Sequence, residues 1–200
     1  MRIVLLICFI ACANLYTRAQ LLSPEQLDTA HVYTSLEEAL VYPQKVYRLD
    51  LTRNRMKSFP EQIFLLTNLN ELILDKNKIT EIPPQISQLK NLQRLSIESN
   101  KIEVWPAELC KLNKLIFLNL GDNFIGRIPD DIRRMQALQT LILWGNIIGY
   151  YPVTMGQLEN LQELDLLHNE MNAEEQTRLV NLMPEVDIHF SPPCVCTFED

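Results

Sequence analysis

The stretch LNELILDKNKITEIPPQISQLKN, residues 69–91, decides the fold, because its pattern recurs along most of the chain. It contains Leu69, Leu72, Leu74 and Asn77 in the frame L-x-x-L-x-L-x-x-N, which appears six times with a period of 23 residues. The frame asparagines are Asn54, Asn77, Asn100, Asn123, Asn146 and Asn169. A fixed period over this length indicates one structural unit that is repeated and stacked.

Each position in this frame has a structural reason. The apolar residues at positions 4 and 6 of the unit alternate with polar neighbours, which is the pattern of a short, half-buried strand. Successive copies then stack as parallel strands about 4.8 Å apart. The asparagine follows the strand, where its amide can bond backbone groups of its own turn and of the next coil. We therefore expect a ladder of buried asparagine amides along the stack.

The second half of the unit repeats as well. An apolar residue and a proline follow five of the asparagines at a constant spacing, as Phe59-Pro60, Ile82-Pro83, Trp105-Pro106, Ile128-Pro129 and Tyr151-Pro152. Proline fixes its own backbone dihedral and lacks an N–H, so it suits the start of a single helical turn. With both halves specified, the chain resembles the leucine-rich repeat family, in its 23-residue variety with an I-P-x-x-I segment, over about three fifths of its length.

The resemblance implies an α/β leucine-rich repeat solenoid, with a curved parallel β-sheet on its concave face and short helical or extended segments on its convex face. One repeat cannot cover its own apolar edge, so the stack needs a cap at each end. The expected division is a signal peptide at 1–19, a lead-in and capping helix at 20–45, six repeats at 46–169, a C-terminal cap at 170–190 and a tail at 191–200.

The N-terminal cap has a local sequence signal. Residues 20–34 show little periodicity and are expected to be extended or loosely ordered. Ser35 and Glu38 then match the S-x-x-E pattern of a capping box, and Pro43 ends the short helix that follows. This opening is similar to that of exported leucine-rich repeat proteins of Gram-negative bacteria.

The C-terminal cap departs from the repeat pattern after the sixth asparagine. Asn172 is expected to begin a true α-helix with an acidic first turn. A last strand should follow, with Ile188 and Phe190 in the places of the second and third frame leucines if this unit is one residue longer.

The N-terminus has the pattern of an export signal. Arg2 precedes an apolar stretch that runs to Ala13, and cleavage is expected after Ala19. The apolar stretch is too short to span a membrane. A buried N-terminal helix is one alternative, and a lipoprotein processed at Cys12 is another. The expected location is therefore periplasmic, cell-surface or secreted.

Composition narrows the possible partners. Removal of residues 1–19 lowers the number of Lys and Arg from 18 to 16 against 25 Asp and Glu, a net charge of −9. An acidic surface without a basic stripe argues against nucleic acid and anionic membranes as partners.

The cysteines that remain after this removal are Cys110, Cys194 and Cys196. Their number is odd, so they cannot all form disulfides within one chain.

The sequence contains no recognisable catalytic or cofactor-binding motif, so no catalytic residue, cofactor or metal is expected. His168, with Asp165 and Glu163 in the preceding strand, comes nearest to a carboxylate–histidine metal site. A solvated charged surface is the simpler interpretation of these three residues.

The candidate site is the concave face, which we define as unit positions 3, 5, 7 and 8. These positions are mainly charged and polar in the first three repeats, and apolar residues appear among them from the fourth repeat onward. Trp144, beside Gly121 and Leu167 in its row, has the character of an interface anchor. Packing against the C-terminal cap is the alternative role. The candidate ligand-binding residues are Trp144, Leu167, Ile142, Phe117, Asn119, Asp165 and His168.

The function that follows is a non-enzymatic, exported module that binds a protein or peptide ligand on its concave face, in line with the resemblance. A rigid solenoid holds side chains in fixed rows, so binding would cost little ordering entropy. The alternatives are a structural or surface-display protein without a concave ligand and, less favoured, a small metal-dependent enzyme. No transmembrane segment is expected, and a monomer is the default expectation.

Overall fold

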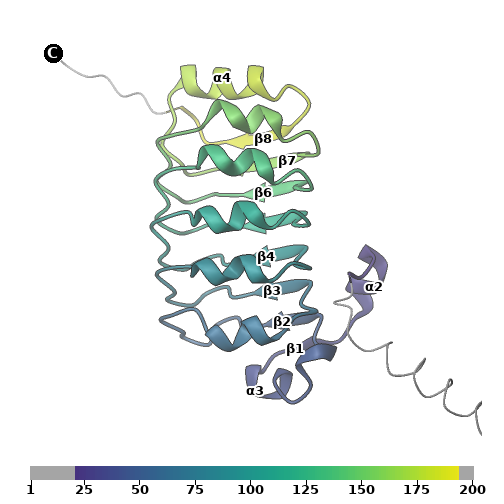
Figure 1. Cartoon of the computed structure of the whole chain (residues 1–200). Helices are drawn as coiled ribbons and strands as arrows, with labels where there is room; N and C mark the ends of the chain where they lie inside the picture. The colour runs from purple at the N-terminus through teal and green to yellow at the C-terminus, as the bar shows by residue number, and fades with distance from the viewer. Residues whose placement is uncertain (1–20, 194–200) are drawn as a thin grey trace, which may run out of the picture.

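The protein is a stack of short coils, each with a strand on one side and a helical turn on the other (Figure 1). The computed structural model describes residues 21–193. Within this range, eight parallel strands form one sheet in sequential order from β1 to β8. This order confirms the α/β solenoid predicted from the 23-residue period. The expected signal peptide, Cys12, Cys194 and Cys196 lie outside the described residues.

The repeat strands are short and share one register. They are β2 (Arg48–Asp50), β3 (Glu71–Ile73), β4 (Arg94–Ser96), β5 (Phe117–Asn119), β6 (Thr140–Ile142) and β7 (Glu163–Leu166). Equivalent frame residues pair directly, as Leu72 does with Leu95 and Leu95 with Leu118. The frame leucines are buried in one continuous core, because each coil covers the apolar edge of its neighbour.

The convex side carries one 3₁₀ turn in each of the first five repeats, as the prolines predicted. These turns are η2 (Glu61–Leu65), η3 (Pro84–Gln88), η4 (Ala107–Lys111), η5 (Asp130–Arg134) and η6 (Val153–Gln157). A proline precedes each turn directly, and its extended backbone turns the chain into the helix. The apolar residue two to three positions into each turn, such as Ile86, is buried against the strands.

The asparagines from the second repeat onward form the expected ladder, but it points backwards along the chain. The Asn100 amide N–H donates to the carbonyls of Ile97 in its own repeat and Leu74 in the preceding repeat. Its Oδ1 accepts the N–H of Ile79, also in the preceding coil, at 3.0 Å. The prediction that the amide bonds the next coil was therefore wrong in direction.

Asn54 is the exception, since its side chain is exposed. The ladder bonds reach back to a preceding repeat, and ahead of the first repeat the described residues form short helices and the two-residue strand β1 (Val32–Tyr33) in place of a repeat. The expected burial of all six asparagines was wrong at Asn54 for this reason.

The lead-in is more ordered than the sequence reading predicted. It contains α2 (Pro24–Thr29), whose capping box joins Ser23 and Gln26, followed by β1. The next elements are α3 (Leu36–Ala39) and η1 (Pro43–Lys45). At α3 the Ser35 hydroxyl accepts the N–H of Glu38, which is one of the two bonds of the predicted capping box. Figure 1 shows α3 and β1 at the end of the stack and α2 beside the first strands.

The C-terminal cap follows the prediction closely. The helix is α4 (Ala173–Leu182), with a capping box between Asn172 and Glu175. The last strand is β8 (Asp187–Phe190), in which Ile188 pairs with Leu164 and Phe190 with Leu166. The additional residue in this unit thus lies before the strand, and the frame register is kept.

Candidate ligand-binding face

The concave face carries half-buried apolar side chains among polar ones. Ile73 lies on β3, Phe117 on β5 and Ile142 on β6, Trp144 lies two residues after the end of β6, and Leu167 directly follows β7. All five are neither fully buried nor fully exposed. We refer to these five residues as the apolar strip. Because each stands on or next to a paired strand, their relative positions are set by the sheet register.

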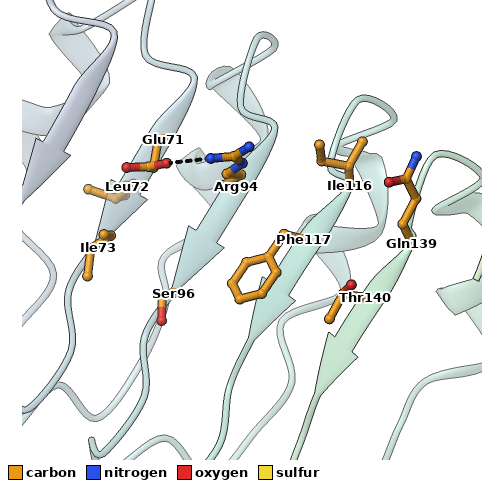
Figure 2. A pocket seen from close by; sticks show the side chains of 9 residues that line it. All are labelled: Glu71, Leu72, Ile73, Arg94, Ser96, Ile116, Phe117, Gln139 and Thr140. Carbon is orange, nitrogen blue, oxygen red and sulfur yellow. Dashed lines mark hydrogen bonds and ion pairs between the residues drawn. The ribbon is translucent and has the colours of Figure 1, made fainter. Parts of the chain in front are cut away.

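A hollow of about 430 Å³ opens in the middle of this face (Figure 2). It crosses four neighbouring strands, β3 to β6, and combines apolar and polar groups. Figure 2 shows the Phe117 ring between the side chains of Ser96 and Thr140. The hollow is lined by Glu71, Leu72, Ile73, Arg94, Ser96, Ile116, Phe117, Gln139 and Thr140.

One wall of the hollow is held by an ion-pair network. Glu71, which is almost fully buried, lies between Arg48 at 2.8 Å and Arg94 at 3.4 Å. Arg94 also donates to the carboxylate of Asp28 in α2 at 2.6 Å. Burial lowers the pKa of Arg94, but the hydrogen bond and charge of Asp28, together with Glu71, outweigh this and raise it. The guanidinium is therefore fixed in place beside the hollow.

The helix α2 is anchored to the same wall through backbone groups. The N–H of Leu22 donates to Asn70 Oδ1 at 2.9 Å, and Gln93 Nε2 donates to the carbonyl of Leu22 at 2.9 Å. Leu27 is fully buried beneath the helix. These contacts explain why α2 stands next to the first strands and supplies Asp28 to Arg94.

Trp144 lies across Gly121 in the second half of the face. A Cβ atom at Gly121 would lie only 2.4 Å from the Trp144 indole Nε1. The indole therefore depends on the absence of a side chain in the neighbouring coil, as the pairing of tryptophan with glycine predicted. Leu167 lies at the same position in the next coil, and its N–H is held by Asp165 Oδ1 at 2.9 Å.

The remaining predicted site residues have structural bonds of their own. Asn119 is buried; its Oδ1 accepts the N–H of Gly121, and its Nδ2 donates to Glu98 Oε2. His168 is exposed in the left-handed backbone region, at φ 57°, and its N–H donates to Ser191 Oγ. Asn119 and Asp165 thus brace the turn after each strand, while Trp144, Leu167, Ile142 and Phe117 present partly exposed apolar surface.

Asp75, at position 7 of the second repeat, is a partly buried carboxyl of the concave face whose pKa is raised. Burial raises its pKa, against the opposing effect of hydrogen bonds from Ser96 Oγ and the Glu98 N–H. The neighbouring charges of Glu98 and Asp50 add to the increase. Three acidic groups therefore lie near the ends of neighbouring strands: Asp50 is the last residue of β2, and Asp75 and Glu98 each lie two residues after β3 and β4.

The two halves of the face differ in charge. The cations Arg48, Arg53, Lys76 and Arg94 all lie in the first three repeats. From β5 to β8, the described concave positions carry Asp122, Glu163, Asp165 and Asp187 and no Lys or Arg. The apolar residues Ile142, Trp144 and Leu167 are thus surrounded by negative charge.

Sequence reasoning missed the hollow. The 23-residue frame puts Ile73, Arg94 and Thr140 at outward positions 5, 3 and 3 of their units, but the mainly charged and polar outward positions of the first three repeats do not indicate a hollow. The adjacency of Arg94 and Phe117 at position 3 of neighbouring repeats was a usable signal, whereas the contribution of α2 was not visible in the pattern.

Among residues 21–193, no group of three or more His, Cys, Asp or Glu is arranged to hold a metal ion. No helix in the described part of the chain is long and apolar enough to cross a bilayer.

A family model described as a leucine-rich repeat region matches residues 61–186. No curated protein matches the chain at a significant level.

Several solved structures are similar. A leucine-rich repeat protein of Leptospira interrogans is 30% identical, with a TM-score of 0.64 over 82% of this chain and 49% of the other. Internalin C2 of Listeria monocytogenes shares the fold, at 23% identity and a TM-score of 0.65 over 79% of this chain and 66% of the other. A plant peptide hormone receptor, RGFR1, solved in complex with RGF2, is 30% identical, with a TM-score of 0.60 over 71% of this chain and 24% of the other. The chain spans about half the length of the Leptospira protein.

Proposed function

This chain belongs to the leucine-rich repeat family, and from that premise we propose that it is a non-enzymatic module that binds a protein or peptide on its concave face. The family match and the similarity to a plant peptide hormone receptor support an interaction role in general. The more specific part of the proposal is that the ligand binds on the concave face.

The apolar strip is the observation that carries this proposal. Ile73, Phe117, Ile142, Trp144 and Leu167 are partly exposed on the face of the sheet, although the core is complete without them. Rigid, partly exposed aromatic side chains beside a hollow are the usual anchors of protein interfaces. The register of the sheet presents them without a conformational search, so little ordering entropy is lost on binding.

The charge distribution indicates the chemistry of the ligand. Around Trp144 and Leu167 the concave positions are acidic, so a ligand segment that carries Lys or Arg beside an apolar side chain would complement this half. The hollow between β3 and β6, with Phe117 and Ile73 beside Arg94, would accept a second apolar side chain. We propose an extended or helical protein segment that crosses both.

Photocrosslinking tests the location of the site. A photoreactive amino acid at position 167, on the concave face, should give adducts when the protein is exposed to the envelope or secreted fraction of its source. The matched control is the same amino acid at position 153, where Val153 is exposed on the convex side. Adducts at position 153 but not at position 167 would place the interaction elsewhere.

We further propose the division into a signal peptide at 1–19, a lead-in and capping helix at 20–45, repeats at 46–169, a cap at 170–190 and a tail at 191–200, with export to the periplasm, the cell surface or the medium. Processing as a lipoprotein at Cys12 would suit the alternative of a surface-display protein. N-terminal mass analysis of the protein from its source distinguishes the two, since simple cleavage exposes Gln20 whereas lipidation leaves a modified Cys12 at the N-terminus.

A further inference from the structure

The C-terminal edge of the sheet has unpaired backbone groups. Within the described residues, β8 pairs with β7 on one side only. In earlier repeats the position 6 N–H donates to the following strand, as Leu120 N does to Ile142 O at 2.9 Å. The same geometry turns the N–H of Phe190 away from β7, together with the N–H and C=O of Ile188.

The chain leaves this edge immediately after Phe190. Ser191 Oγ accepts the N–H of His168 at 2.7 Å, and the Ser191 carbonyl accepts Gln176 Nε2 of α4 at 3.0 Å. Both contacts direct the chain back over its own last coil. Val186, Ile188 and Phe190 are left only partly buried at the end of the core.

We propose that a second copy of this chain pairs with this edge, β8 antiparallel to β8, about a two-fold axis at Ile188. An antiparallel register centred there places Ile188 opposite Ile188 of the second copy and Val186 opposite Phe190. The half-buried apolar residues of each copy then cover those of the other. A strand edge with no lysine or proline in it is a ready template for such pairing.

The polar groups of β8 complement one another in the same register. Asp187 of each copy lies opposite His189 of the other copy. The two-fold axis therefore creates two such pairs, and both lie on the concave side. In one copy Asp187 Oδ2 and His189 Nε2 are already 3.5 Å apart, and their side chains are 78% and 43% exposed. Each carboxylate can therefore accept a hydrogen bond from the imidazole of the other copy.

The backbone bonds are also compatible. Ile188 N–H and C=O exchange two bonds across the axis, and the N–H of each Phe190 donates to a Val186 carbonyl. The Val186 N–H already donates to Met183 O at 3.2 Å, so it needs no new partner. This register leaves no outward N–H of β8 unpaired.

The dimer would be weak, because four residues of edge strand bury less than the ~1,200 Å² of a stable interface. We expect a dissociation constant on the order of 100 µM. The two sheets would continue into one another, with both concave faces on the same side. Five strand spacings of about 4.8 Å separate the two β6 strands by about 24 Å, and Trp144 lies three residues beyond the axis in opposite directions in the two copies, which adds about 20 Å along the strands. The two Trp144 residues would therefore stand about 30 Å apart, which suits a ligand with two copies of its binding segment.

Sedimentation velocity of the full chain in reducing buffer tests the proposal, because the reducing agent prevents cysteine-linked dimers. Between ~10 µM and ~1 mM the protein should shift from monomer to dimer. His189→Asp places like charges opposite each other twice and should weaken association at least about tenfold. Adding Asp187→His to it restores opposite partners and should restore association.

Three outcomes would overturn the proposal. The wild-type chain could remain monomeric over the whole range. The His189→Asp variant could associate as strongly as wild type, which would place the contact on another surface. Association could also appear only after removal of residues 194–200, which would assign this edge to the tail of the same chain. Both substituted side chains are exposed, so the variants should fold, and far-ultraviolet circular dichroism checks this.

Discussion

At the scale of single residues, the buried asparagines connect neighbouring coils. Each amide from Asn77 to Asn169 donates to carbonyls of two successive repeats and accepts an N–H from the preceding coil. A short apolar residue at this position would leave those backbone groups buried without a partner. Such a loss costs about 1–3 kcal/mol per site.

The first prediction compares two asparagines that occupy the same unit position. Asn100→Ala should lower the free energy of unfolding by about 1–3 kcal/mol, because Asn100 is buried and its bonds join two coils. Asn54→Ala is the matched control and should change it by less than about 0.5 kcal/mol, because Asn54 is exposed. Urea denaturation measures both, and equal midpoint shifts would show that the ladder is not what stabilises the stack.

The second prediction concerns Asp75. Its pKa is higher in the folded protein than in the unfolded chain. At a pH between these two pKa values, the folded protein therefore binds more protons than the unfolded chain does. The free energy of unfolding therefore falls as the pH rises through this window. An asparagine keeps the acceptor oxygen for Ser96 and Glu98 but carries no charge.

Asp75→Asn should consequently be at least as stable as the parent at pH 7, and its advantage should disappear at a pH below the ordinary carboxyl range. Thermal melts across pH measure this, with Asp122→Asn at an exposed position as the control for net charge. A variant that is less stable than the parent at pH 7 would show that the carboxylate is favourable here.

The third prediction concerns the contact between Trp144 and Gly121. A methyl group at Gly121 would lie 2.4 Å from the indole nitrogen, so Gly121→Ala must displace the Trp144 ring. The fluorescence and near-ultraviolet circular dichroism of tryptophan should change. Gly149→Ala is the control, since an added Cβ there meets nothing within 4 Å. Identical spectra for the two variants would mean that the indole does not rest on Gly121 in solution.

At the scale of elements, strand burial was predictable because apolar residues recur at fixed positions of the unit. Leu95 is fully buried between β3 and β5 and tests this register. Leu95→Ala should cost about 2–5 kcal/mol, through lost apolar contacts and the cavity left behind. Val104→Ala, in the same repeat but 74% exposed, should cost less than about 0.5 kcal/mol. Equal losses in urea denaturation would contradict the register.

In the two caps, some helices and strands could be predicted from the sequence and others could not. The helix α4 was predictable from Asn172 and Glu175, and β8 from the frame that places Ile188 opposite Leu164. The helix α2 was missed, although Ser23, Pro24 and Gln26 carry the signals of a helix start. Six residues bury only Leu27, so no apolar period marks this helix, and its position depends on contacts with Asn70 and Gln93 far along the chain.

At the scale of the whole molecule, the fold was predictable because each coil repeats the same local solution. The candidate site was predictable only in part. Outward positions follow from the strand period, and this located Trp144, Leu167, Ile142 and Phe117 on one face. The period does not tell which outward residues form hydrogen bonds with one another. The three-dimensional structure was therefore needed to identify the bonds by which Asn119 and Asp165 brace their turns, and to find the hollow beside Arg94.

The central claim is that the concave face binds a protein ligand, and Trp144→Ala tests it most directly. The variant should keep the melting temperature of the parent, because the indole lies on the surface of the sheet and outside the core. Its affinity for the partner found by crosslinking, measured by isothermal titration calorimetry, should fall about 30-fold or more, or about 2 kcal/mol. Val153→Ala on the convex side should change neither quantity. A lower melting temperature with unchanged affinity would contradict the account, because Trp144 would then be a packing residue and the ligand would bind elsewhere.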